Sequence, residues 1–220
     1  MDAISELSAE QIIDLFSKPI NSIRQAAWRS ETDSSASGKI DVWGGCSPVL
    51  AIDFGDDQQS CLFMGATDTA LLFRLSHCDD YKAVLGLTHQ LGGNESNSGG
   101  FIGMFDLASV VCPASEWNHL DVTKVSVVTT NTSVTIVGIC LWINLGIRIG
   151  LFVAPYPGIT LSFNETCDSI LNQATQAQQD GLVHIVSKEF ANKETPKQIE
   201  TIDWYDWLRE TRNTRKNTSE

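Results

Sequence analysis

The chain has 220 residues, of which 42% are hydrophobic, 19% charged and 8% aromatic, and this composition excludes a disordered or fibrous protein. A chain of this length buries about 70% of its unfolded surface on folding, which is enough for one core without crosslinks. The 15 Lys and Arg against 27 Asp and Glu give a net charge of -12, and this charge disfavours general binding to nucleic acid.

The six cysteines form no C-x-x-C pair, and none has a histidine at metal-ligand spacing. The sequence therefore predicts no metal site, and nothing in it indicates a cofactor. The first residues, Met1 to Glu6, lack the basic and apolar segments of a secretory signal. We expect reduced, buried thiols in a cytosolic setting.

A short N-terminal helix is indicated by Ser8 followed by Gln11, which is a capping-box pattern. The helix cannot continue through Pro19, because proline lacks the backbone N–H and clashes with the preceding turn. The apolar side chains on one face of this helix are Ile12, Ile13, Leu15 and Phe16. We expect residues 1–18 to form an N-terminal helical arm.

The next part of the chain reads as strands joined by turns and loops. Residues 31–38 are polar and have no apolar periodicity, which is typical of a loop. The segments 39–54 and 60–75 contain short apolar runs broken by Gly, Pro and Asp, which predicts strands. Residues 92–100 form a second polar, glycine-rich loop that lacks the lysine of a phosphate-binding loop.

The segment 134–153 has the hydropathy of a membrane span but the periodicity of strands. From Ile139 to Val153 every odd position is aliphatic, whereas the even positions include Asn144, Gly146, Arg148 and Gly150. A membrane helix would have to place Asn144 and Arg148 in lipid. We therefore expect strands with a bend or turn near residues 144–146, because the run is longer than an ordinary strand.

Shorter alternating runs flank this segment, at residues 125–129 and 159–163, and a turn is predicted at 130–133. Since no helices alternate with these strands, residues 19–190 are predicted to form a mostly β, antiparallel β-sandwich. Near its end, the glutamine-rich residues 168–181 read as a short helix or a loop. Residues 183–190 read as one last strand.

Residues 191–220 form a polar C-terminal arm with 6 Lys and Arg and 6 Asp and Glu, so the first 190 residues carry the whole negative charge. The arm nevertheless contains a cluster of large apolar side chains, and such surface is seldom left exposed on a flexible end. The cluster consists of Trp204, Tyr205, Trp207 and Leu208. It is expected to dock, either on its own chain or on another one.

The residues give no catalytic constellation. Residues 77–80 (HCDD) bring a base, a thiol and carboxylates together, but adjacent side chains of an extended chain point to opposite faces, so we interpret them as a polar turn. Cys46 precedes an apolar run and is expected to be an inert thiol. Asp53, Asp56 and Asp57 offer too few oxygen ligands for calcium and are interpreted as a solvated turn. We predict that the chain is not an enzyme.

Two stretches carry a resemblance to a known family. The first is residues 19–30 (PINSIRQAAWRS) with 38–42 (GKIDV), and the second is residues 116–118 (EWN) with 134–142 (VTIVGICLW). With a helical arm before a β-rich body and a second arm after it, they resemble the jelly-roll coat proteins of plant picorna-like viruses of the comovirus and cheravirus group, family Secoviridae. The chain departs from that pattern in the loop of residues 31–37 and in the aromatic tail.

The resemblance implies a structural capsid protein that assembles with other jelly-roll coat chains into a small icosahedral, pseudo-T=3 shell enclosing RNA. It implies location in the virion, and in the host cytoplasm during assembly, without contact to a membrane. The two arms are expected to bridge subunits, and the candidate interface residues are Trp204, Tyr205, Trp207, Leu208, Ile12 and Phe16. Weak contact with the RNA is expected near Arg24, Arg29 and Lys39.

Two other functions remain open. One is a non-enzymatic, cytosolic, lectin-like binding module that would use the loops at residues 92–100 and 130–133. The other is an enzyme, for which Cys112 and His119 would be the least implausible pair.

Overall fold

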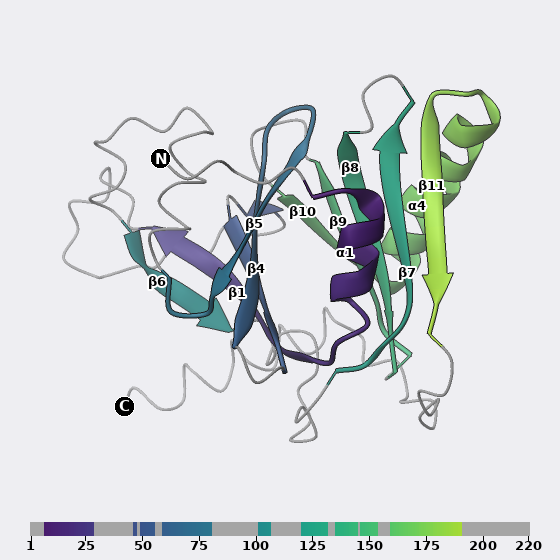
Figure 1. Ribbon diagram of the computed structural model, residues 1–220. Helices are drawn as coiled ribbons and strands as arrows, with labels where there is room; N and C mark the ends of the chain where they lie inside the picture. The colour runs from purple at the N-terminus through teal and green to yellow at the C-terminus, as the bar shows by residue number, and fades with distance from the viewer. Residues whose placement is uncertain are drawn as a thin grey trace, which may run out of the picture.

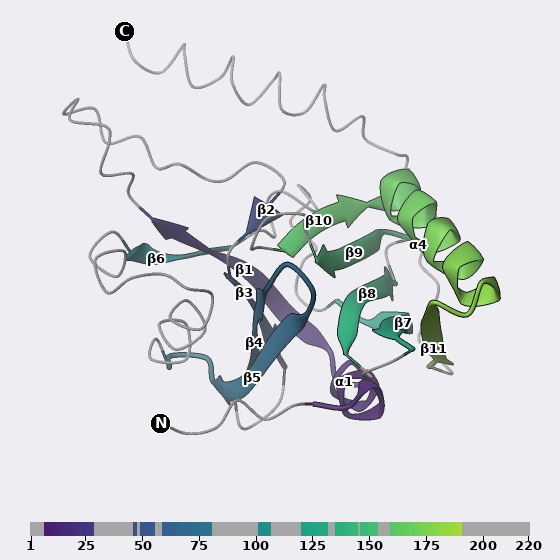
Figure 2. The same cartoon turned by 90° about the horizontal axis from the view of Figure 1, so that it is seen from above.

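The computed structural model describes residues 7–28, 46–47, 49–55, 59–80, 101–106, 120–131, 135–144, 146–153 and 159–190. Two antiparallel sheets pack face to face (Figure 1, Figure 2). In spatial order, the first sheet consists of β5 (Leu71–His77), β4 (Ser60–Ala66), β3 (Val49–Phe54), β1 (Ile20–Trp28) and β6 (Phe101–Asp106). The second sheet consists of β11 (Val183–Glu189), β7 (Val122–Thr130), β8 (Ile136–Ile143), β9 (Arg148–Val153), β10 (Ile159–Phe163) and β2 (Cys46–Ser47).

This architecture confirms the predicted antiparallel β-sandwich with a short N-terminal helix. Among the described strands, consecutive ones are mostly neighbours: β3, β4 and β5 in the first sheet, and β7 to β10 in the second. Such meanders differ from the two Greek keys that make up a jelly roll. The described strands therefore show a β-sandwich whose neighbouring strands mostly follow each other in sequence. They do not show the strand order of a jelly roll.

Strand β1 is an interior strand of the first sheet, between β3 and the edge strand β6, although residues 20–28 show no simple alternation. Its buried side chains Ile20 and Ile23 are separated by an odd number of positions. The pairing with β3 slips between Ile20 and Ser22, and such a bulge inserts one extra residue into the strand. The bulge shifts the buried face by one position and so removes the period-two signal.

Strands β8 and β9 form a hairpin within residues 134–153, where strands with a bend or turn were expected. The turn lies where a bend was predicted, and Gly146 adopts a left-handed backbone conformation there (φ 73°). Ile139 and Leu141 point into the core between the sheets, whereas Cys140 points to the opposite face of the second sheet. The apolar odd positions therefore form the inner face of the sandwich. No helix within the described ranges is long and apolar enough to cross a membrane.

Helix α1 (Ala9–Leu15) begins with the predicted capping box, in which the Ser8 hydroxyl accepts from the Gln11 N–H and the Gln11 side chain accepts from the Ser8 N–H. It lies against β7 and β11 (Figure 1). Ile12 and Phe16 are both 0% exposed, and the Phe16 ring packs edge-on against Phe54 of the first sheet. This placement corrects the expectation that these two side chains contact neighbouring subunits, because they are part of this chain's own core.

Helix α4 (Asn164–Gln179) decides between the two alternatives for the glutamine-rich segment in favour of a helix. It covers the outer face of the second sheet (Figure 2), where Cys167, Ile170 and Leu171 pack on side chains of β8 and β9. The chain then returns as β11 beside β7, which confirms the predicted last strand. Only one stripe of the helix is apolar, so its other side carries the polar glutamines.

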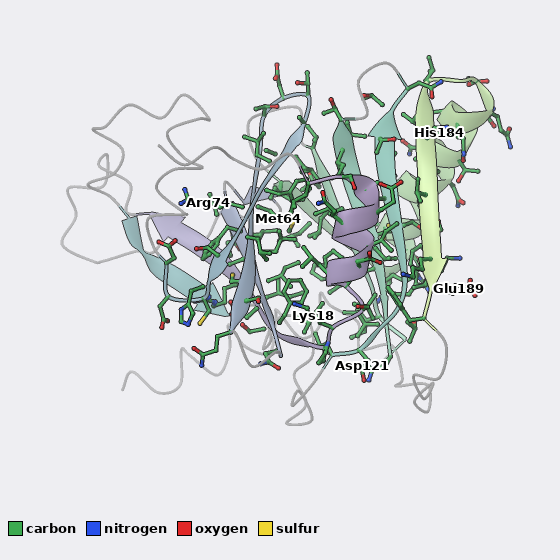
Figure 3. All side chains as sticks on the ribbon, viewed as in Figure 1. Lys18, Met64, Arg74, Asp121, His184 and Glu189 are labelled. Atoms are coloured by element: carbon green, nitrogen blue, oxygen red, sulfur yellow. The ribbon has the colours of Figure 1, made fainter. Side chains whose placement is uncertain are left out.

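One hydrophobic cluster joins α1 to both sheets and fills the space between them. Figure 3 shows the side chains that occupy this space, among them Met64, which is 0% exposed. The largest fully buried side chains come from α1, β1, β3 and β4 and from the segments next to them. The core therefore lies between the sheets, and polar groups are displaced to the outer faces and the sheet edges.

Candidate functional site

The best-defined polar site lies on the outer face of the first sheet, beside β1, β3 and the turn after β5. A surface hollow of about 400 Å³ is lined there by Asn21, Ser22, Arg24, Asp53, Phe54, Gln59 and Cys78. Its position follows from strand register, since Ser22 pairs with Asp53, Asp53 with Cys61, and Cys61 with Ser76. Four neighbouring strands thus place a row of polar side chains across one face of the sheet.

Arg24 and Asp53 form the centre of this row. The Arg24 Nη2 donates to Asp53 Oδ1 at 2.6 Å and to the carbonyl oxygen of Cys78 at 3.0 Å. The Ser22 hydroxyl donates to the other oxygen of Asp53. The two charged side chains are only 18% and 16% exposed, so the charges compensate each other in a partly dry environment.

This ion pair bears on the role expected for Arg24. A cation that contacts RNA must present its charge to phosphate, but the charge of Arg24 is paired with Asp53 of β3, and its guanidinium also donates to the turn after β5. The structure shows Arg24 in an ion pair within the chain, and an RNA contact at this residue stays a prediction. Arg29 and Lys39, the other expected RNA contacts, lie outside the described residues.

The two thiols at this site are not activated nucleophiles. Burial, and after it the charge of Asp53, raises the pKa of Cys61. Partial desolvation and the carboxylates of Asp79 and Asp53 raise the pKa of Cys78. Because the thiolate is the reactive form, both groups stay protonated and poorly reactive at neutral pH. Neither thiol at this site is therefore poised as a nucleophile.

Residues 77–80 form the predicted polar turn, but the reason given for excluding a joint role is wrong. The chain turns at Cys78, so one ligand atom each of His77, Cys78 and Asp79 comes within 4.8 Å of the other two. The Nδ1 atom of His77 accepts from the backbone N–H of Asp79 at 3.3 Å. The turn thus brings the three side chains together, with the Nδ1 atom of His77 already in a hydrogen bond.

A second hollow, of about 550 Å³, lies along the outward side of α4, where Glu165 and Asp168 are among its lining residues. Asp168 forms an ion pair with Arg148 of β9, in which Nε and Oδ1 are 2.8 Å apart. The other lining residues are Ser169, Asn172, Gln173 and Gln176. This hollow is polar and acidic, which makes it unsuited to phosphate or RNA.

The remaining sequence-predicted site residues lie outside the described ranges: Trp204, Tyr205, Trp207 and Leu208 of the tail, and Cys112 and His119. The loop at residues 92–100 lies outside them as well. Sequence reasoning missed the Arg24–Asp53 pair, whose members are 29 positions apart and belong to no local motif. Only strand pairing could have revealed it, and the bulge in β1 hides that pairing.

Comparisons with known proteins find no family model that matches this sequence, no curated protein with a significant match, and no solved structure with a significant match.

Proposed function

We propose that this chain is a structural coat protein that assembles with other coat chains into a small icosahedral shell enclosing RNA, located in the virion and, during assembly, in the host cytoplasm. The observation that supports the proposal is the position of the two stretches that resemble coat proteins. Residues 20–28 of the first stretch form β1, an interior strand of one sheet, and residues 136–142 of the second lie in β8, an interior strand of the other.

The character of the described surface supports the same function. A shell subunit needs a rigid body with surfaces for neighbours, and it needs no catalytic group. Within the described part of the chain, the first hollow is lined by the Arg24–Asp53 pair, whose charges compensate each other, and its thiols stay protonated. The second hollow is lined by acidic and polar side chains. This pattern favours a structural role over catalysis.

The sheet edges give such a body places to contact other subunits. In the described part of the chain, β5 pairs only with β4, and β11 pairs only with β7. Figure 3 shows His184 and Glu189 toward opposite ends of β11, and both side chains are exposed. Edge strands expose backbone groups that can pair with another chain. The proposed contacts are these edges together with the aromatic cluster of the C-terminal arm.

The test is the assembly state of the full-length chain, measured by light scattering and negative-stain microscopy with and without RNA. We expect particles or defined oligomers and RNA that resists nuclease. Trp204→Ala/Trp207→Ala should lower the oligomer fraction at least tenfold, because aromatic anchors dominate interfaces. The matched variant Trp204→Phe/Trp207→Phe should keep most of it.

A monomer of 24.1 kDa that persists at high concentration and with RNA would contradict self-assembly. In that case glycan and peptide binding should be measured, because the lectin-like module would become the better proposal. If the chain forms an oligomer that the tail substitutions do not change, the coat proposal stands. The contact between subunits would then be assigned to the sheet edges.

A further inference from the structure

A pair of buried cysteines lies on the outer face of the second sheet, far in sequence from the polar row of the first. Cys140 belongs to β8, and Cys167 lies in the first turns of α4, 27 positions later. Their Sγ atoms are 2.8 Å apart, and both residues are 0% exposed. A disulfide bond is about 2.0 Å long, so a shift of about 0.8 Å would join the two sulfurs.

The close approach depends on Gly150 in the neighbouring strand β9. Gly150 pairs with Cys140 on one side and with Ser162 on the other. A Cβ atom at position 150 would lie 3.0 Å from the Cys167 Sγ and would overlap the Ser162 hydroxyl. The missing side chain therefore leaves the space into which Cys167 reaches toward Cys140.

Polar contacts fix the start of α4 on the same strand. The side-chain oxygen of Asn164 accepts from the backbone N–H of Arg148 at 3.0 Å, and Arg148 forms its ion pair with Asp168. Ile170 and Leu171 pack around the cysteines. Because the helix is held at several points, the two sulfurs face each other in the folded chain rather than meeting by chance.

The contact between the sulfurs affects the two thiols in opposite directions. A hydrogen bond from Cys140 lowers the pKa of Cys167, while the same bond, together with burial, raises the pKa of Cys140. Thiolates are the form that reacts with oxidants. Cys167 is therefore the group that reacts first, and Cys140 is the partner that resolves the product.

We propose that Cys140 and Cys167 are an oxidation site at which a small peroxide forms an intramolecular disulfide that fastens α4 to β8. The Cys167 thiolate attacks one oxygen of hydrogen peroxide, the O–O bond breaks, and a sulfenic acid forms as hydroxide leaves. The Cys140 thiol then attacks the Cys167 sulfur, and the S–S bond forms as water leaves. In total, two thiols lose two electrons and two protons, and one peroxide becomes two waters.

Burial selects the oxidant. Since both residues are 0% exposed, a bulky disulfide such as oxidised glutathione cannot reach them, whereas peroxide is small enough to enter when the first turn of α4 opens. The crosslink closes a loop of 27 positions and removes freedom from the unfolded chain. The oxidised protein should therefore melt about 5–10 °C higher than the reduced one.

The experiment uses the full-length chain, reduced with dithiothreitol, desalted, treated with hydrogen peroxide and quenched with catalase. Free thiols are then blocked with iodoacetamide, and peptides are mapped by mass spectrometry without reduction. We expect one linked peptide pair containing Cys140 and Cys167, which dithiothreitol separates. The melting temperature should rise with the yield of this link and return on reduction.

Cys61→Ser is the matched control, because it removes another buried thiol and should leave the link unchanged. Cys140→Ser should abolish the link and leave a sulfenic acid at Cys167, which dimedone traps when it is added together with urea to unfold the chain. If a serine variant fails to fold, the peptide map of the unaltered chain still decides. Links that involve other cysteines, sulfinic acid without a link, or two unreacted thiols at 140 and 167 would each overturn the proposal.

Discussion

Arg24 shows how a single side chain can carry a charge that the surface does not present. The Arg24 side chain is only 18% exposed, so its charge depends on a partner within the protein. One oxygen of Asp53 accepts from Arg24, and the other accepts from Ser22. Removing one member leaves the other poorly solvated and uncompensated. The pair therefore links β1, β3 and the turn after β5, and it matters for stability rather than for ligand binding.

We expect Arg24→Ala to lower the free energy of unfolding by about 2–3 kcal/mol, because Asp53 would lose its partner in a mostly buried setting. Urea unfolding of the single and double variants at positions 24 and 53 measures the coupling, which should be about 1–2 kcal/mol. Lys188→Ala is the control, since the Lys188–Asp14 pair is 49% and 71% exposed and should contribute less than about 1 kcal/mol. Equal losses for both pairs would contradict this interpretation.

At the scale of elements, α4 can pack on the second sheet because two positions of the underlying strands are glycine and carry no side chain. Gly138 and Gly150 lie on the outer face of β8 and β9, on either side of the Phe152 ring. Any larger residue there would meet that ring or the Ser162 hydroxyl. The glycines among the even positions of residues 134–153 are therefore not signs of a solvent-facing side, because they make room for a helix.

Gly150→Ala should destabilise the protein by about 1–3 kcal/mol, because the added methyl group enters a filled space. The change should lower the melting temperature by about 3–10 °C in thermal unfolding followed by circular dichroism. Adding Ser162→Ala should recover part of the loss, since it removes the hydroxyl that the methyl group would meet. A stability equal to that of the unaltered chain would show that α4 does not pack closely on β9.

At the scale of the whole molecule, α1 joins the two sheets into one core and does not extend away as an arm. Its apolar face contacts the second sheet, and Phe16 also touches Phe54 of the first. The Lys188–Asp14 pair adds a surface contact between the strand β11 and the helix. Helix α1 is thus part of the folded body. The proposed contacts with other subunits are therefore limited to the sheet edges and the C-terminal arm.

Phe16→Ala should lower the free energy of unfolding by about 3–5 kcal/mol, because it leaves a cavity between the helix and both sheets. Urea or thermal unfolding of the full chain measures the loss, with Leu182→Ala as control at a site that is 65% exposed. A loss below about 1 kcal/mol for Phe16→Ala would indicate that α1 contributes little to the core and can act as a separate arm. The control should change stability by less than about 0.5 kcal/mol.

Local rules were enough to predict the fold class, the N-terminal helix and the strands within residues 134–153 with a bend or turn between them. A capping box and a helix-breaking proline act within a few residues, and the alternation of Ile139, Leu141 and Ile143 reports the inner face of a strand directly. The candidate interface residues Trp204 and Trp207 came from composition and resemblance, and they remain predictions.

The ion pair, the cysteine pair and the packing of the helices could be seen only in the three-dimensional structure, because they depend on groups that are distant in sequence. Strand pairing places Asp53 beside Ser22 and Arg24, and helix packing places Cys167 against Cys140. The bulge in β1 hides the period that would have indicated a strand, and one face of an amphipathic helix does not tell whether it packs on its own chain or on another. Local patterns fix which face of an element is apolar, but only the complete packing fixes what covers that face.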